Sequence, residues 1–436
     1  MTISIKSSKQ NDLSGEITIP GDKSISHRAI LFGLLSEGKT EIHGSQNSED
    51  VQNSLNVARL LGIETKIQSS IIYLDSPGMK GLSSPNKDLY FGNSGTGMRL
   101  FAGFLSSLNF ASVLTGDASL SYRPMMRIIE PLKKMGAKIS AANKENPPLK
   151  ISPSKGLKGI SYKMPIASAQ VKSSILLAGL NADGTTQIHE KYQTRDHTET
   201  MMKTFGANIS SSNGIIEIQR SDIKTPGQIE VPGDFSSAAF FISACLISEN
   251  SEIKIKNVGI NKTRKAFLDS LLDMNARIDV TNIRQLGTED VADLIIKSSN
   301  LLPIKIKESI IPNLIDELPL FFLIASLIDG ESEFIGLSEL KHKESDRLSI
   351  MVKNLQELDV KVHLKEGSLK ITGKKDRIFS DGIFDSHGDH RIAMTMLVAG
   401  LRSPKGLVVN NTDCINTSFP EFVDQAKILG FNLNDG

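Results

Sequence analysis

Six stretches of the chain repeat the same order of polar and apolar positions. Each stretch begins with polar or glycine residues, continues as an apolar run of helical length, breaks briefly and resumes as a β-rich segment. Such a pattern predicts an apolar helix followed by a strand, and its recurrence indicates an internal repeat. The six stretches begin near Asp22, Asn93, Ala167, Asp234, Ile315 and His387.

A second, more amphipathic helix is predicted after each of these stretches. All six of these helices reach a similar end, and the ends lie 69 to 84 residues apart. The end positions are Gly62, Gly136, Gly206, Asn275, Asp359 and Gly430. Glycine and asparagine are favoured where a helix ends in a left-handed residue, and the β-branched residues that follow predict a strand. Alternation such as that of residues 361–372 then predicts a hairpin, so the sequence predicts six βαβαββ units of about 73 residues.

The two ends of the chain fit this repeat only if they are combined. The last unit stops at Gly436 without room for its hairpin, while residues 3–6 and 15–19 read as two spare strands. We therefore expect the N-terminus to complete the sixth unit.

A longer internal match divides the chain into halves. Residues 15–24 read GEITIPGDKS and residues 227–236 read GQIEVPGDFS, an offset of 212. Each Pro-Gly leaves a predicted strand and precedes a predicted helix, as a crossover or hinge would. We predict two domains of three units each, residues 1–20 with 233–436 and residues 21–232, joined by a hinge at Pro20–Gly21 and Pro232–Gly233.

Composition narrows the class of protein without indicating its chemistry. Lys and Arg number 50 against 49 Asp and Glu, which argues against a chain built to bind nucleic acid. The hydrophobic share of 39% is too high for disorder, and 2 Cys cannot build a disulfide framework. The first residues show no signal or transit peptide pattern, and the most apolar run, residues 318–328, is too short to span a membrane. We expect a soluble cytoplasmic protein that binds neither nucleic acid nor membrane.

One familiar motif is a false match. Residues 33–40, GLLSEGKT, fit the P-loop pattern, but a true P-loop follows a strand and opens a helix. Here a helical run precedes the motif and a strand-like run follows Lys39, so we interpret it as a helix end and a turn.

Polar and charged residues gather at the starts of the apolar helices. They are Lys23, Ser24 and Arg28 at the first, Asn93, Ser94, Gly95, Thr96 and Arg99 at the second, Ser168 and Gln170 at the third, and Asp389, His390 and Arg391 at the sixth. Helix N-termini bind phosphate and carboxylate groups, whereas a cation there is disfavoured by the helix dipole. The lysine and the arginines therefore indicate anion binding rather than simple capping.

Further charged clusters lie at or before the amphipathic helices. They include Arg123, Arg195, Lys343, Glu344, Asp346 and Arg347, and the carboxylates Asp316 and Asp389 belong to the same repeated structural level. Taken alone, each is typical of a solvated face; taken together, they predict a ring of cations around a few carboxylates that could move protons. No cluster has the spacing of metal ligands, and Cys245 and Cys414 are interpreted as packing residues.

Seven segments carry a resemblance to a known family. PGDKSISHR, GNSGTGMR, LSYRPM, ASAQVKS, TRDHTE, KESDRL and GDHRIAM resemble, in order and over nearly the whole chain, the signatures of the 5-enolpyruvylshikimate-3-phosphate synthases. The resemblance implies an α/β fold, a two-domain inside-out α/β barrel with three repeats in each domain that closes around its substrates. It also implies transfer of the enolpyruvyl group of phosphoenolpyruvate to the 5-hydroxyl of shikimate-3-phosphate, with no metal or organic cofactor.

The resemblance also implies roles for individual residues. Asp316, Glu344 and Lys23 are expected to be catalytic. The residues expected to bind shikimate-3-phosphate are Lys23, Ser24, Arg28, Ser168, Ala169, Gln170, Arg195, Asp316 and Lys343. Those expected to bind phosphoenolpyruvate are Lys23, Gly95, Arg123, Gln170, Arg347 and Arg391, with Asn93, Thr96 and Arg99 shaping the glycine-rich segment. One departure is Thr417, which stands where some members have a lysine that contacts phosphoenolpyruvate.

Two other interpretations stay open at this point. The related UDP-N-acetylglucosamine enolpyruvyl transferases share the donor and the fold, but they usually carry Lys-Asn where this chain has Lys23–Ser24, and a reactive cysteine in a mobile loop. A non-catalytic two-domain anion-binding protein would use the same cations without the carboxylates. We expect small-molecule substrates and a monomer.

Overall fold

The computed structural model describes residues 3–143 and 145–436. The chain divides into two compact units. Unit 1 is formed by the chain up to Pro20 together with Pro232–Gly436, and unit 2 by Gly21–Val231. The hinge at the two junctions between these units stays a prediction.

Unit 2 is built around three buried helices. They are α1 (Lys23–Leu35), α3 (Gly95–Leu105) and α5 (Ala169–Gly179). Residues on all sides of these helices are buried, because their apolar side chains leave no face suited to water. Three amphipathic helices accompany them, namely α2 (Glu49–Leu60), α4 (Met126–Lys134) and α6 (His197–Thr204).

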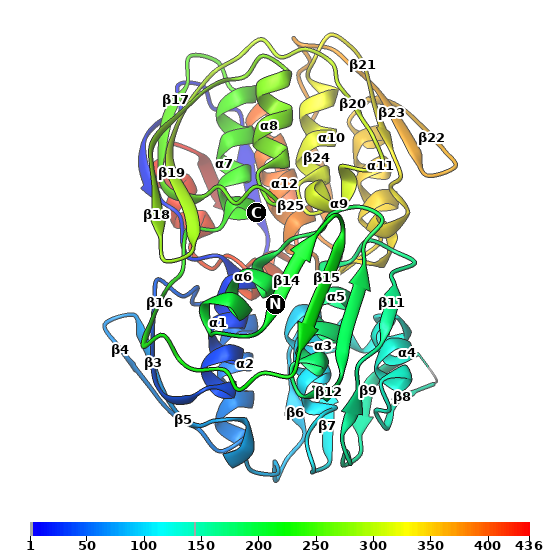
Figure 1. Cartoon of the computed structure of the whole chain (residues 1–436). Helices are drawn as coiled ribbons and strands as arrows, with labels where there is room; N and C mark the ends of the chain where they lie inside the picture. The colour runs from blue at the N-terminus through cyan, green and yellow to red at the C-terminus, as the bar shows by residue number, and fades with distance from the viewer. Residues whose placement is uncertain (1–2, 144) are drawn as a thin grey trace. The chain divides into compact units, whose positions relative to one another are not determined.

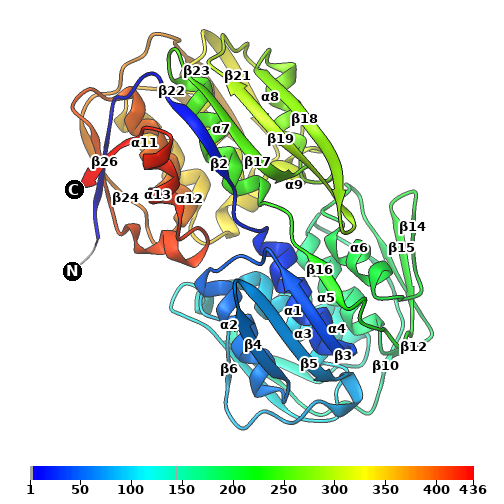
Figure 2. The same cartoon turned by 90° about the vertical axis from the view of Figure 1, so that its left-hand side faces the viewer.

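Three four-stranded sheets enclose the helices of unit 2, and Figure 2 shows one of them covering α1. The first has the order β16 (Gln228–Glu230), β3 (Glu37–His43), β5 (Ile71–Pro77), β4 (Glu64–Gln68). The second is β6 (Leu89–Tyr90), β7 (Ser112–Thr115), β9 (Asn146–Ile151), β8 (Ile139–Ala142). The third is β11 (Ser161–Lys163), β13 (Thr185–His189), β15 (Ile215–Gln219), β14 (Ile209–Ser212), and β10 (Leu157–Lys158) pairs separately with β12 (Ala182–Asp183).

Unit 1 repeats this plan, and Figure 1 shows its helices side by side with strand hairpins outside them. The buried helices are α7 (Phe235–Ile247), α10 (Leu318–Ser326) and α12 (His390–Ala399). The accompanying helices are α8 (Ala266–Asp273), α11 (Arg347–Glu357) and α13 (Phe422–Ile428), with a short α9 (Ile311–Leu314) before α10. Among the described residues of the chain, no helix is both long and apolar enough to cross a lipid bilayer.

The three sheets of unit 1 have the same internal order as those of unit 2. The first is β2 (Ser14–Thr18), β17 (Glu252–Gly259), β19 (Glu289–Lys297), β18 (Arg277–Leu286). The second is β20 (Lys305–Ile306), β21 (Gly330–Ile335), β23 (Ser368–Gly373), β22 (Lys361–Lys365). The third is β24 (Gly382–Asp385), β25 (Leu407–Asn410), β1 (Ile5–Ser8), β26 (Asn432–Asp435).

The six predicted repeats are confirmed by these sheets. In every four-stranded sheet of the described chain the first two strands are parallel and the remaining pairings are antiparallel. The predicted left-handed helix ends are confirmed as well, since all six have positive φ: Gly62 (97°), Gly136 (98°), Gly206 (80°), Asn275 (69°), Asp359 (57°) and Gly430 (93°). In the false P-loop, α1 ends at Leu35 and Lys39 lies within β3, as expected.

The prediction for the N-terminal strands is half right. The first of them, β1, lies between β25 and β26 and so completes the sixth repeat. The second does not belong there: β2 pairs in parallel with β17 of the fourth repeat. The chain enters unit 2 directly after β2, but β2 itself stays in unit 1, beside the strand that follows α7. β16 takes the equivalent place beside β3 in unit 2.

The two glycines of the matching segments are sites of close backbone approach. A Cβ atom on Gly21 would lie 1.9 Å from the carbonyl oxygen of Gly44, and one on Gly233 would lie 2.6 Å from that of Asn257. Gly44 and Asn257 both have positive φ and occupy equivalent places beside the crossovers. Only glycine lets the chain leave its strand this close to the neighbouring backbone.

A buried histidine ties three helices of unit 2 together. His27 Nδ1 lies 2.8 Å from the Ser54 hydroxyl of α2, and Nε2 lies 3.1 Å from the Ser94 hydroxyl. Ser94 in turn caps α3 by accepting the amide of Gly97. Burial, together with the nearby charges of Lys23 and Arg28, lowers the pKa of His27 to about 3. The ring is therefore neutral, with one nitrogen donating and the other accepting.

We predict that Gly21→Ala and Gly233→Ala each destabilise the unit that contains the glycine. The added methyl group overlaps a carbonyl oxygen, and overpacking of this kind costs about 1–3 kcal/mol or more. Gly206→Asn is the control, because Gly206 has positive φ with no atom within 4 Å of a Cβ and asparagine tolerates that conformation. Urea unfolding followed by circular dichroism measures the effect; alanine variants as stable as the control would contradict it.

We predict that His27 makes the fold sensitive to acid. Its folded pKa is below its unfolded value of 6.5, so between about pH 6.5 and 3 the unfolded chain binds a proton that the folded chain does not. Above about pH 6.5 the neutral ring makes its full contribution to the free energy of unfolding. As the pH falls below this value, that contribution decreases by up to about 1.4 kcal/mol per pH unit.

His27→Asn tests this, since asparagine does not titrate. The urea midpoints of wild type and variant are compared by circular dichroism at pH 7.5, 6 and 5. We expect the wild type to lose more stability than the variant on acidification. Parallel decreases in the two proteins would show that His27 is not the titrating group.

Candidate active site

The buried helices α1, α3, α5, α7 and α12 begin in side-chain caps, whereas α10 does not, and many of the candidate residues follow these caps directly. Asp22 accepts the amide of Ile25 at the start of α1, and Ser168 accepts that of Val171 at the start of α5. Asp389 likewise accepts the amide of Arg391 at the start of α12. Because each cap satisfies part of the exposed N–H groups, the first-turn side chains are held at a defined place in each unit.

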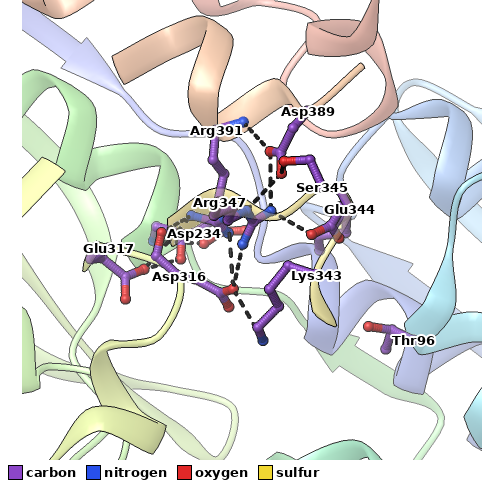
Figure 3. A network of polar contacts seen from close by, with 12 residues as sticks. Thr96, Asp234, Asp316, Glu317, Lys343, Glu344, Ser345, Arg347, Asp389 and Arg391 are labelled. Atoms are coloured by element: carbon purple, nitrogen blue, oxygen red, sulfur yellow. Dashed lines mark hydrogen bonds and ion pairs between the residues drawn. The ribbon is translucent and has the colours of Figure 1, made fainter. Parts of the chain in front are cut away.

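Arg347 is the centre of the polar network in unit 1 (Figure 3). Its Nε lies 2.8 Å from Asp389 Oδ2, its Nη1 3.3 Å from Asp316 Oδ1 and its Nη2 2.5 Å from Glu344 Oε2. The side chain is only 1% exposed. Burial alone would lower the pKa of Arg347, but the three carboxylates raise it overall. The guanidinium is thus permanently charged and links the starts of α10, α11 and α12.

Asp316 is surrounded by cations in the same network. Besides Arg347, Lys343 Nζ lies 3.8 Å and Arg391 Nε 3.9 Å from its Oδ1. Arg391 Nη1 also donates to the Asp316 carbonyl at 3.0 Å. The carboxylate remains 14% exposed, so it is held in place and still accessible. Five predicted residues, Asp316, Lys343, Glu344, Arg347 and Arg391, are therefore brought together in unit 1.

A second buried layer supports this network and was missed by the sequence analysis. The carboxylate of Glu317 is 0% exposed, accepts a short hydrogen bond from the Ser236 hydroxyl and lies 3.9 Å from Arg391 Nη1. Arg264 Nη1 lies 3.7 Å from Glu317, and Arg264 Nη2 donates to Asp234 at 3.2 Å. The sequence did contain one signal for this layer, since Glu317 stands directly before the most apolar run of the chain. A carboxylate at such a place is expected to be buried and therefore to need a cationic partner.

In unit 2, Lys23 and Arg28 lie on α1 in different surroundings. Lys23 Nζ lies 3.1 Å from Asp50 Oδ2, and its side chain is 18% exposed. Arg28 is buried and donates to the Thr198 hydroxyl at 2.7 Å, to the Ser173 hydroxyl at 3.0 Å and to the Ser24 carbonyl at 2.9 Å. Arg28 thus joins α1, α5 and α6, while Lys23 keeps an accessible ammonium group.

The glycine-rich segment of unit 2 is linked to α5. Gln170 accepts a short hydrogen bond from Arg99 and donates to the Thr96 hydroxyl at 2.8 Å. These contacts fix the amide of Gln170 between two residues of α3. The structure thus joins the predicted segments ASAQVKS and GNSGTGMR.

Arg123 lies against the same segment. Its Nη2 donates to Asn93 Oδ1 at 3.0 Å, and Asn93 donates to Asp117 at 2.8 Å. A Cβ on Gly95 would lie 2.6 Å from Arg123 Nη1. Gly95 therefore leaves the space that the guanidinium of Arg123 occupies.

The other candidates occupy the expected elements. Ser168 and Ala169 stand at the start of α5, and Arg195 lies in the loop before α6. Thr417 closes a 3-10 turn by donating to the Cys414 carbonyl at 2.7 Å, so its short neutral side chain brings no cation to that place.

The two cysteines have the character expected of packing residues. Burial raises the pKa of both Cys245 and Cys414 to about 12, so both remain thiols at neutral pH, whereas the thiolate is the reactive form. Among the described residues no group of three or more His, Cys, Asp or Glu side chains is placed to hold a metal ion.

The chemistry of these residues is anion binding combined with proton transfer. Fixed arginine and lysine groups bind carboxylate and phosphate, and accessible carboxylates such as Asp316 and Glu344 can accept or donate protons. The sequence analysis identified the cations and these carboxylates but not their partners Asp50, Asp117, Arg264 and Glu317.

Comparisons with known proteins agree on one family. The family model described as EPSP synthase (3-phosphoshikimate 1-carboxyvinyltransferase) matches residues 7–426. The 3-phosphoshikimate 1-carboxyvinyltransferase of Alkaliphilus metalliredigens is 42% identical, covering 97% of this chain and 98% of its own. That of Dichelobacter nodosus is 44% identical, covering 97% and 95%.

Solved structures give the same result. EPSP synthase from Acinetobacter baumannii is 40% identical, covers 100% of both chains and superposes with a TM-score of 0.87. The enolpyruvyl transferase NikO from Streptomyces tendae, at 15% identity and a TM-score of 0.77, shares the fold. The predicted inside-out α/β fold is thereby confirmed, and the chain belongs to the EPSP synthase (3-phosphoshikimate 1-carboxyvinyltransferase) family.

Proposed function

We propose that this chain transfers the enolpyruvyl (1-carboxyvinyl) group of phosphoenolpyruvate to the 5-hydroxyl of shikimate-3-phosphate, releasing phosphate, in the shikimate pathway of aromatic amino acid biosynthesis. The observation that carries the proposal is the family match across residues 7–426. The cluster of Asp316, Lys343, Glu344 and Arg347 supports it, because the reaction needs both fixed cations and accessible carboxylates.

The anionic groups of the substrates account for the proposed binding residues. Each substrate carries one carboxylate and one phosphate. The phosphoenolpyruvate ligands in this proposal are Lys23, Gly95, Arg123, Gln170, Arg347 and Arg391. The shikimate-3-phosphate ligands are Lys23, Ser24, Arg28, Ser168, Ala169, Gln170, Arg195, Asp316 and Lys343.

In the addition step, Asp316 accepts the proton of the 5-hydroxyl while the hydroxyl oxygen attacks C2 of phosphoenolpyruvate. Glu344 delivers a proton to the methylene carbon, which becomes a methyl group, so the electron pair of the double bond forms the new C–H bond. The cations around Asp316 hold its carboxylate in place, and general acid–base transfer of this kind requires hydrogen-bond reach.

In the elimination step, the methyl carbon returns a proton to Glu344 and the bond between C2 and the phosphate oxygen breaks. The phosphate leaves with that oxygen and takes a proton from the ammonium of Lys23, which also stabilises its charge. Asp316 releases the proton that it took from the hydroxyl, and solvent returns a proton to Lys23, so all three groups regain their starting state. No metal or organic cofactor takes part in the proposed reaction. We expect a monomeric cytoplasmic enzyme that interacts with neither nucleic acid nor membranes, in keeping with the formal net charge of +1.

Acceptor specificity is the direct test. We expect phosphate release from phosphoenolpyruvate only when shikimate-3-phosphate is added, and none with UDP-N-acetylglucosamine or without an acceptor. A continuous phosphate assay measures all three conditions. Release with the nucleotide sugar alone would identify the related transferase instead, and binding without release in any condition would indicate a non-catalytic anion-binding protein.

We predict that Asp316→Asn lowers kcat by roughly 10²–10⁴-fold, the usual contribution of a general base. Asparagine keeps the shape of the side chain but cannot take the hydroxyl proton. Steady-state kinetics and calorimetric binding of shikimate-3-phosphate are measured together, with Asp424→Asn, an exposed aspartate of unit 1, as the control. Near-normal turnover in Asp316→Asn would reject Asp316 as the base.

A further inference from the structure

Lys172 is a lysine in the first two turns of the buried helix α5, and the proposed reaction does not use it. Its side chain is 1% exposed. Its Nζ lies 2.6 Å from Glu199 Oε1 and 3.2 Å from Glu190 Oε2, and it donates to the Thr194 carbonyl at 3.3 Å. The two glutamates are also buried, with side chains 6% and 4% exposed. An unpaired ammonium would not be tolerated there.

The cluster fixes a segment that has no regular secondary structure. Residues 190–196 lie between β13 and α6 outside any strand or helix, so no ladder of backbone hydrogen bonds determines their course. The Thr194 hydroxyl donates to Glu190 Oε1 at 2.5 Å, while the carbonyl of the same residue accepts from Lys172. Thr194 is thus held at its hydroxyl and at its carbonyl.

Arg195 follows Thr194 directly in the chain. The anchor on Thr194 therefore sets the point from which the Arg195 side chain extends. Lys172 also belongs to the first helical hydrogen bond of α5, because its amide donates to the Ser168 carbonyl at 3.0 Å. One buried lysine consequently connects the start of α5, which holds Ser168 and Gln170, with the loop that holds Arg195.

A neighbouring contact reinforces the same junction. The hydroxyls of Ser173 and Thr198 lie 2.6 Å apart, and Arg28 donates to both. Burial raises the pKa of Glu190 despite the opposing attraction of Lys172, which shows how costly a charge is at this place. Buried ion pairs seldom stabilise a fold more than apolar side chains of similar size do. If these residues only filled space, apolar side chains would therefore suffice.

We infer that Lys172, Glu190, Glu199 and Thr194 form a positioning cluster that aligns Arg195 with the start of α5 to grip the phosphate of the acceptor. This inference rests on the proposed function, because it takes shikimate-3-phosphate as the acceptor. The cluster acts through Arg195 and the α5 terminus and does not touch the substrate itself. Its loss therefore weakens recognition of the phosphate and leaves recognition of the rest of the acceptor intact.

Two variants test the cluster. Thr194→Val keeps the branched shape and the backbone contact to Lys172 but removes the hydroxyl that holds Glu190, so it preserves the buried ion pairs. Lys172→Met removes the ammonium at similar length and is the stronger change. Lys80→Met is the matched control, because Lys80 forms an exposed ion pair with Asp222 in the same unit, with side chains 82% and 88% exposed.

Calorimetric titration with shikimate-3-phosphate and with unphosphorylated shikimate, in the absence of phosphoenolpyruvate, gives a readout independent of turnover. We expect the Kd for shikimate-3-phosphate to rise roughly 10- to 100-fold in both variants, the penalty typical of a misplaced binding group. The Kd for shikimate should stay within about twofold in Thr194→Val, as should the KM for phosphoenolpyruvate, since neither depends on the phosphate grip.

A variant that binds shikimate-3-phosphate and shikimate equally more weakly than the wild type would overturn the inference. So would a variant that binds both as the wild type does but unfolds at a lower temperature. Either result would leave the cluster with a structural role. If Lys172→Met fails to fold, Thr194→Val decides between these results alone. A wild type that binds no shikimate-3-phosphate would instead reject the proposed function, and the inference with it, so the two failures are distinguishable.

Discussion

The architecture depends on the need of six helices to bury their whole circumference. A helix that is apolar on every side cannot lie at a surface, so each set of three is enclosed by sheets rather than packed outside them. Within each unit this arrangement brings helix starts together, as the contacts among Asp316, Arg347 and Asp389 in unit 1 show. The same burial that stabilises the fold thereby gathers the polar helix termini.

Charge pairing at these termini follows from the cost of desolvation. A buried guanidinium such as Arg347 is tolerated only because three carboxylates surround it. In unit 2 Arg28 donates to hydroxyls and a carbonyl and Arg99 donates to the amide of Gln170, whereas Lys172 is paired with Glu190 and Glu199. The two units thus repeat one backbone plan with different polar chemistry.

Local sequence signals predicted much of this structure because their causes are local. The left-handed helix ends at positions such as Gly62 and Asn275 depend on a single residue's backbone preference, and all six are found where expected. The placement of β2 was missed because strand pairing over more than 200 residues depends on the crossover as well as on the strand itself. The sequence likewise indicated which cations stand at helix starts. It could not indicate partners such as Asp50 or Glu199, since an ion pair is made by the fold and not by spacing along the chain.

The pairing of β1 with β25 and β26 has a consequence for synthesis on the ribosome. Ile5 faces Val409 on one side and Asp435 on the other, so strands that are far apart along the chain share one sheet. At roughly 5–20 residues per second, tens of seconds separate their emergence. Unit 2, a continuous segment, can form its sheets during that interval, whereas β1 waits with both of its edges unpaired and open to other strands. The sheet that contains β1 is therefore completed only after β26 has emerged, and until then β1 can pair wrongly.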